Sequence, residues 1–139
     1  PTTGLDPQVR HLIWDKLREL KKDGVTILLT THYMEEAFQI CDDLIIMNKG
    51  QKVLSGHPGD LIKNNIETYV LEILVPEKSD QSFPDTIRRE STHNRILLYS
   101  NEFTEIKKIS DRFGTGEFIL RQSNLEDVFL RITGSKLDE

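Results

Sequence analysis

The feature that most constrains the fold is a short apolar run at residues 25–30, which reads Val-Thr-Ile-Leu-Leu-Thr. It is rich in β-branched residues and does not alternate between apolar and polar positions. Such a run is typical of a parallel strand that is buried on both faces. It follows a helical pattern over residues 7–23 and precedes a second helical pattern near Met34. A strand between two helices predicts an α/β architecture.

The elements around this strand have clear local signals. Asp6 can cap the free amides of the first helix, Pro7 suits its first position, and Gly24 ends it. After the second helix, residues 44–47 read as another buried strand. The turn at residues 48–50 then predicts a hairpin with the strand that follows, and a short helix is expected from Pro58 to Asn64.

Residues 66–139 have a different pattern of apolar and polar residues, which predicts a small α+β module. Strands are expected at residues 68–75, 95–100 and 117–121. The expected helices are a short one at residues 85–90, one capped by Asn101 and ended by Gly114, and one that opens on a capping box of Ser123 and Glu126 and ends at Gly134. The chain therefore divides into two predicted domains, 1–65 and 66–139.

Composition narrows the classes of function. The chain has 139 residues, with 18 basic and 23 acidic side chains and a net charge of -5. This acidity argues against a general nucleic-acid binder, which must neutralise phosphates. The single cysteine, Cys41, excludes an internal disulfide or a multi-thiolate metal site. No metal site is expected, and no apolar run approaches the roughly 20 residues that span a bilayer.

Several motifs follow one another in a fixed order within residues 1–65. The chain opens with Pro-Thr-Thr-Gly-Leu-Asp-Pro, reaches Thr-Thr-His at residues 30–32, and continues with Cys-Asp-Asp-Leu-Ile-Ile-Met-Asn-Lys-Gly at 41–50. This order closely resembles the C-terminal part of the ATP-binding subunit of ABC transporters. His32 matches the switch histidine of that family. The family's D-loop is matched by Thr3, Gly4, Leu5 and Asp6.

The second half resembles one branch of the same family. Residues 125–130 read Leu-Glu-Asp-Val-Phe-Leu, and Thr133-Gly134 follows. This tail is similar to the small domain appended to the ATPase subunit of bacterial drug and ABC-2-type exporters. The resemblance implies a partial P-loop ATPase core of parallel strands with helices over residues 1–65, followed by an α+β accessory domain.

His32 is the candidate catalytic residue. It lies just past the end of the predicted parallel strand, where open α/β sheets bind ligands. An imidazole there can donate a hydrogen bond to a γ-phosphate and help to orient the attacking water. For a lone histidine the plainer reading is a helix cap, but the surrounding resemblance favours the switch role.

Two further sites have a structural and a functional reading. Asp6 is a helix cap in its own right. The resemblance adds a role for its loop at the interface of two nucleotide-binding domains, and Gly4 would allow the sharp turn that this loop needs. Glu35 and Glu36 are expected to lie on a solvated helix face rather than to act in acid–base catalysis.

The family's phosphate-binding motifs are missing. The sequence holds no Gly-x-x-x-x-Gly-Lys-[Ser/Thr] loop and no Leu-Ser-Gly-Gly signature. We therefore expect the chain to be the C-terminal piece of a longer ATPase that uses ATP and Mg²⁺. Alone it should bind neither and should not hydrolyse ATP. The strand at residues 25–30 would have two unpaired edges, which predicts domain swapping, self-association or disorder.

The resemblance implies the partners and the location. A second nucleotide-binding subunit would complete the dimer, and a transmembrane permease would use its motion, with the protein on the cytoplasmic face of the membrane. Nucleic acid is not an expected partner. Two alternatives remain open: a non-enzymatic regulatory or dimerisation module of such a subunit, and a DNA-repair type of ABC ATPase.

Overall fold

The computed structural model describes residues 1–78 and 82–134, which form two compact units. The first unit is Pro1–Leu61, and the second begins at Ile62. The division falls within helix α3 (Pro58–Asn65), which was predicted from the sequence. No helix in the described part of the chain is both long and apolar enough to cross a membrane.

The first unit begins with the expected long helix, α1 (Pro7–Lys22). Asp6 caps it as predicted, because its Oδ1 accepts hydrogen bonds from the amides of Gln8 at 2.9 Å and Val9 at 3.3 Å. Trp14 is the one fully buried side chain of α1. The shorter helix α2 (Met34–Ile40) packs against α1 and has no side-chain cap.

The predicted hairpin is present. Strand β1 (Leu44–Asn48) pairs antiparallel with β2 (Gln51–Gly56). The two turn residues, Lys49 and Gly50, both have positive φ, 50° and 75°. This is the requirement of the type I′ turn, whose twist matches that of the strands it joins.

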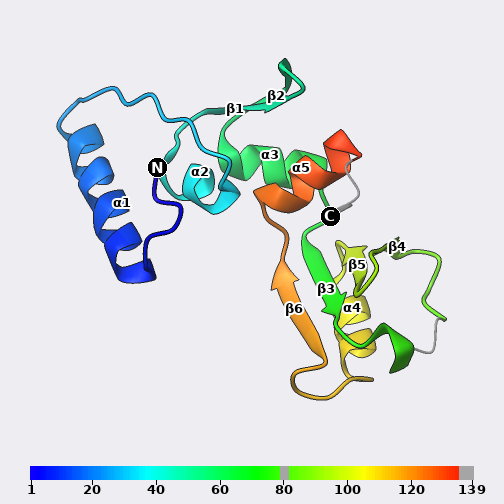
Figure 1. Ribbon diagram of the computed structural model, residues 1–139. Helices are drawn as coiled ribbons and strands as arrows, with labels where there is room; N and C mark the ends of the chain where they lie inside the picture. Colours follow the sequence, from blue (N-terminus) through cyan, green and yellow to red (C-terminus); the bar gives the residue numbers. More distant parts are fainter. Residues whose placement is uncertain (79–81, 135–139) are drawn as a thin grey trace. The chain divides into compact units, whose positions relative to one another are not determined.

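Residues 25–30 differ from the expectation. They form no strand, and none of the strands in the described residues pairs with them, so the first unit does not contain the predicted parallel sheet. In Figure 1 they run as an extended loop between α1 and α2. The side chain of Leu28 is 95% exposed rather than buried. The physical reason is that a strand needs a hydrogen-bonded neighbour, and this part of the chain offers none.

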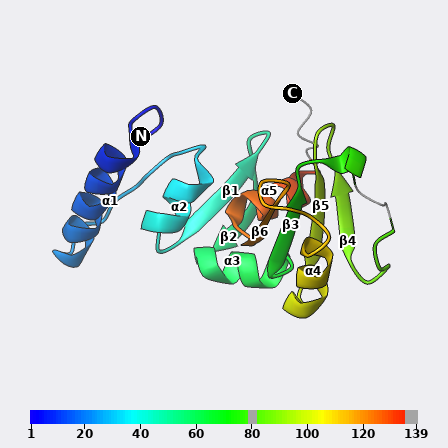
Figure 2. The same cartoon turned by 90° about the horizontal axis from the view of Figure 1, so that it is seen from below.

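The second unit is built on a four-stranded antiparallel sheet (Figure 2). Its strands lie in the order β4-β5-β3-β6. They are β3 (Tyr69–Ile73), β4 (Arg88–Ser91), β5 (Ile96–Ser100) and β6 (Phe118–Gln122). A short 3-10 turn, η1 (Pro76–Lys78), follows β3. Three of the four strands were predicted from the sequence.

Helices cover this sheet. Helix α4 (Phe103–Ser110) packs on one face and closes the core. The buried members of that core are Leu71, Ile73, Ile87, Ile96, Leu98, Ile106 and Ile109. Helix α5 (Leu125–Thr133) ends at Gly134, which has a φ of 60°, as the sequence predicted. All five residues of β5 are buried, so this strand is covered on both faces.

Three local predictions for the second unit were wrong. Residues 85–90 form no helix, because part of this segment is β4, the edge strand beside β5. Asn101 does not cap α4, because its Oδ1 accepts hydrogen bonds from Thr68 instead. The capping box lies one residue later than predicted and is formed by Asn124 and Asp127.

Candidate functional site

The loop that precedes α1 forms a tight turn. The amide of Leu5 donates to the carbonyl of Thr2 at 3.2 Å. Gly4, the third residue of this turn, has a φ of +83°, which matches a type II turn. A Cβ at Gly4 would meet no atom within 4 Å, so the glycine is needed for its backbone angle and not for space. Thr3, Gly4, Leu5 and Asp6 are exposed.

His32 lies on a bend just before α2, and its side chain is exposed. Thr31 fixes this bend, because its Oγ1 accepts a hydrogen bond from the amide of Tyr33 at 3.0 Å. The backbone of His32 is therefore enclosed in a local hydrogen-bonded turn, while its imidazole remains free to meet a ligand.

Glu36 connects this bend with the loop before α1. Its side chain is 0% exposed, and its Oε1 accepts hydrogen bonds from Thr2 Oγ1 at 2.7 Å and from Trp14 Nε1 at 3.4 Å. Burial raises the pKa of the carboxyl, but the hydrogen bonds from Thr2, Thr31 and Trp14 lower the pKa further, to about 2. Glu36 is thus held ionised in a buried position.

Arg10 on α1 makes a second connection between the same two segments. Its Nη1 donates to Tyr33 Oη at 3.0 Å, and its Nη2 donates to the carbonyl of Leu5 at 3.3 Å. The guanidinium also lies 5.0 Å from the ring centroid of Tyr33. Such a cation–π contact restrains both groups.

The sequence identified the two segments but missed the side chains that join them. The expectation of a solvated face is wrong for Glu36, because its side chain is buried and its Oε1 accepts hydrogen bonds from Thr2 and Trp14. It is correct for Glu35, which is exposed. One signal was present: Glu36 lies four residues before the buried Ile40, and such residues share a helix face.

A hollow of about 1220 Å³ lies beside residues 24–31 in the first unit. Its lining is largely apolar and includes Ile45 and Met47 of β1, which are 63% and 60% exposed. Residues 25–30 line this hollow and form no strand, so they present an apolar surface without a sheet partner.

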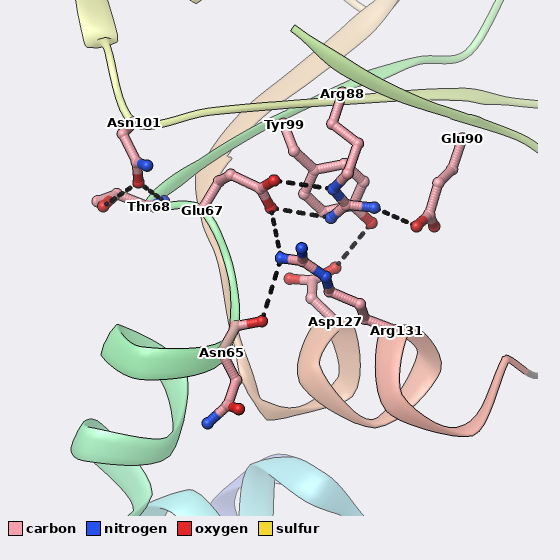
Figure 3. Close-up of polar contacts among 9 residues, drawn as sticks. All are labelled: Asn65, Glu67, Thr68, Arg88, Glu90, Tyr99, Asn101, Asp127 and Arg131. Carbon is pink, nitrogen blue, oxygen red and sulfur yellow. Dashed lines mark hydrogen bonds and ion pairs between the residues drawn. The ribbon is translucent and has the colours of Figure 1, made fainter.

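The second unit carries a separate polar cluster, drawn in Figure 3. Arg88 of β4 binds both carboxylate oxygens of Glu67, at 2.8 and 2.9 Å, and its guanidinium lies 4.0 Å from the ring centroid of Tyr99. Arg131 of α5 donates to Glu67 at 3.3 Å and to the carbonyl of Asn65 at 3.2 Å. The cluster therefore ties the end of α3, the sheet and α5 together.

Among the described acids of the second unit, Asp127 is the most buried. Its side chain is 4% exposed and accepts hydrogen bonds from both terminal nitrogens of Arg121, at 2.7 and 2.9 Å. It also accepts from the amide of Asn124 at 2.9 Å, which completes the capping box. Burial and the nearby charge of Asp127 raise the pKa of Tyr99, whose Oη donates to Asp127 at 3.5 Å.

The ion pairs and hydrogen bonds of this cluster join β4, β6 and α5 and suit a structural role. Residues 125–130, singled out by the resemblance, supply buried packing through Leu125 and Val128 and the cap through Asp127. Across residues 1–78 and 82–134, no three His, Cys, Asp or Glu side chains gather closely enough to hold a metal ion.

Comparison with known proteins gives close relatives along the entire chain, although no protein-family model matches it. The chain is 39% identical to "Nod factor export ATP-binding protein I" of Rhizobium leguminosarum bv. viciae, with 100% of this chain and 46% of that protein covered. The proteins of the same name in Paraburkholderia xenovorans and Mesorhizobium japonicum are 40% and 41% identical, with 47% and 42% of their lengths covered.

The chain thus spans a little under half the length of these relatives. Their similarity runs from the loop before α1 through the bend at His32 to the second unit, since all of this chain is matched. Over its full length, the chain is homologous to part of the ATP-binding subunit of ABC transporters.

Proposed function

We propose that the chain is the C-terminal part of the ATP-hydrolysing, energy-coupling subunit of an ABC exporter. The observation that carries this proposal is the identity of 39–41% to export ATP-binding proteins over the whole chain. Residues 1–65 are then the end of the nucleotide-binding domain, a partial P-loop core. In the longer protein, residues 25–30 would join a parallel sheet whose other strands lie outside residues 1–65. Residues 66–139 are an accessory domain.

His32 is the residue that meets the nucleotide in this proposal. Its exposed imidazole, on a bend fixed by Thr31, supports this role. From there it donates a hydrogen bond to the γ-phosphate and helps to hold the attacking water in line. Phosphoryl transfer depends on such positioning more than on covalent chemistry.

The turn at Thr3, Gly4, Leu5 and Asp6 is the part that contacts the second subunit. Its exposure and its fixed shape support this role, because a preorganised loop loses little entropy when it is covered. Coupling between the two ATP sites would pass through this loop.

The residues present could form only a small part of a binding site for ATP and Mg²⁺. Bound ATP supplies the γ-phosphoryl group whose hydrolysis drives transport. His32 offers one donor to it, but the sequence has no phosphate loop, which contributes most of the anion-binding amides in such sites. The chain alone should therefore bind ATP poorly and be inactive.

The proposed partners are a second ATP-binding subunit and a membrane permease, at the cytoplasmic face of the membrane. The net charge of -5 disfavours nucleic acid. The exposed apolar side chains of residues 25–30, such as Leu28, also favour self-association of the chain when it is produced alone.

The experiment begins with the coding sequence upstream of Pro1. We expect it to encode a phosphate loop and, just before Pro1, an apolar strand ending in Asp-Glu. In the longer protein, His32→Ala should abolish most phosphate release from Mg-ATP, while His93→Ala, an exposed histidine of the second unit, should leave it unchanged. A start codon directly at Pro1, or full ATP turnover by His32→Ala, would refute the proposal.

A second candidate function is a regulatory or dimerisation role for residues 66–139. It is favoured by the second unit's own core and polar cluster. Removal of these residues from the longer protein distinguishes the two. Loss of dimers with intact nucleotide binding would favour the regulatory role. A DNA-repair type of ABC ATPase is disfavoured by the export relatives.

A further inference from the structure

Two segments far apart in the sequence meet at one buried carboxylate in the first unit. Thr2 begins the turn before α1, and Thr31 begins the bend that carries His32. Thr2 Oγ1 donates a hydrogen bond to Glu36 Oε1 at 2.7 Å, and Glu36 lies in the first turn of α2, directly after that bend. Trp14 of α1 donates to the same oxygen at 3.4 Å.

We propose that Glu36 is a positioning residue that ties the turn at residues 2–5 to the bend at His32, so that neither segment moves without the other. The tie is short, fully buried and made of charge-assisted hydrogen bonds, which are stronger and more directional than bonds between neutral groups. Glu36 itself does not touch the nucleotide.

The burial of the charge explains why the tie is rigid. An ionised carboxylate inside the unit must keep its donors, because losing one leaves a buried charge poorly satisfied. A displacement of Thr2 therefore pulls on Glu36 and, through it, on α2 and the bend at its start. Thr2 and Glu36 are both 0% exposed, so water cannot replace the lost donor without opening the unit.

Arg10 supports the same coupling independently. It holds the far end of the turn through the carbonyl of Leu5 and holds the bend through Tyr33, the neighbour of His32. The turn is thus anchored to the histidine segment at its first residue by Glu36 and at its last residue by Arg10.

This inference rests on the proposed function, because it assigns the two segments to the coupling loop and the switch histidine. In the full-length subunit, a loose tie would leave nucleotide binding intact and misplace the imidazole. Misplacement of a catalytic group by about 1 Å can cost on the order of 100-fold in rate. The expected signature is a lower kcat with an unchanged KM for ATP.

The test uses the full-length ATP-binding subunit, four single variants and the double variant that combines Glu36→Gln with Thr2→Val. Glu36→Gln keeps the shape and removes the charge, and Thr2→Val removes the hydroxyl. Thr2→Ser restores the hydroxyl. Glu35→Gln is the matched control, because Glu35 is the exposed neighbour on the same helix.

We expect Glu36→Gln and Thr2→Val each to lower kcat by about 10- to 100-fold, with KM for ATP within about twofold of the wild type. The double variant should be no worse than the poorer single variant, because both remove one interaction. Thr2→Ser should restore most of the rate. A kcat for Glu36→Gln equal to that of Glu35→Gln, or additive losses in the double variant, would overturn the inference.

Hydrogen exchange of residues 1–10 gives a readout that does not need ATP turnover. The Leu5 amide is protected by the carbonyl of Thr2, so loss of the tie should speed its exchange by about threefold or more in both variants. If the wild-type subunit shows no ATPase activity, the proposed function fails, and exchange alone then decides the inference. Unchanged exchange at Leu5 in Glu36→Gln and in Thr2→Val overturns it.

Discussion

The clearest stability prediction concerns Asp127 in the second unit. Asp127→Asn keeps the size of the side chain but replaces one carboxylate oxygen with an amide that cannot accept a hydrogen bond. Arg121 donates to both carboxylate oxygens, at 2.7 and 2.9 Å, so one of these two hydrogen bonds is lost. At that position an N–H group of Arg121 then faces the N–H group of the new amide. The bond from the amide of Asn124 is also weakened.

The size of the effect follows from the burial of the pair. Removing one partner of a buried ion pair costs roughly 3–5 kcal/mol. Arg121 is 25% exposed and lies 3.7 Å from Glu72 Oε1, so water and a second carboxylate stabilise part of its charge. We therefore expect a loss of about 2–4 kcal/mol in the free energy of unfolding of the second unit. This is a large share of the stability of a small domain.

The assay is hydrogen exchange of the β3 and β5 amides, followed by mass spectrometry. A loss of 2–4 kcal/mol corresponds to exchange that is roughly 30- to 1000-fold faster, at about 1.4 kcal/mol per factor of ten. Glu126→Gln is the control, because Glu126 is an exposed carboxylate on the same turn of α5. Exchange in Asp127→Asn within about threefold of that control would refute the reasoning.

Three further predictions concern the first unit, where Trp14 is the chain's only tryptophan and its fluorescence reports unfolding in urea. The pKa of Glu36 lies near 2 in the folded unit, below its ordinary value of 4.5. Its ionised form therefore stabilises the unit above pH 4.5. This contribution, on the order of 3 kcal/mol, is lost as the pH falls from 4.5 toward 2. Glu36→Gln should flatten that part of the pH profile, and an equally steep loss in the variant would contradict the assignment. Gly4→Ala should lower the free energy of unfolding by about 1 kcal/mol, because φ at Gly4 is +83°. The control Gly59→Ala, at a helical position without positive φ, should lower it less. Equal unfolding midpoints of the two variants in urea would count against the turn. Arg10→Lys should lower stability by about 1 kcal/mol, because an ammonium cannot span Tyr33 and Leu5, and an unchanged midpoint would rule out that connection.

The sequence predicted elements well where the signal was local. The cap at Asp6, the hairpin turn at Lys49-Gly50 and the glycine after α5 each depend on a few neighbouring residues, and all three are present. The strands β3, β5 and β6 were also found, because their apolar runs are bounded by turn residues.

The failures share one cause, which is that the deciding contact lies far away in the sequence. Residues 88–91 are polar and look locally unlike a strand, yet pairing with β5 makes them one. Residues 25–30 look like a buried strand, but a pattern reports only the preference of a segment and not the presence of a partner. Asn101 binds Thr68, which is 33 positions away.

The candidate site was predicted in part. Its two exposed segments were located through resemblance, and the turn at Gly4 has the expected backbone. The side chains that connect them were missed, because a glutamate early in a helix is usually solvated. Burial of Glu36 depends on hydroxyl and indole donors from Thr2 and Trp14, which lie 34 and 22 positions away.

The open segment at residues 25–30 has a practical consequence for work on the isolated chain. Its six residues carry no charge, proline or glycine, which is the composition of segments that stack into cross-β aggregates. Charged residues, which oppose such stacking, flank the segment closely only on its N-terminal side, at Lys21, Lys22 and Asp23. Soluble yield should therefore fall steeply with concentration, and co-expression with the polypeptide that completes the sheet should restore it.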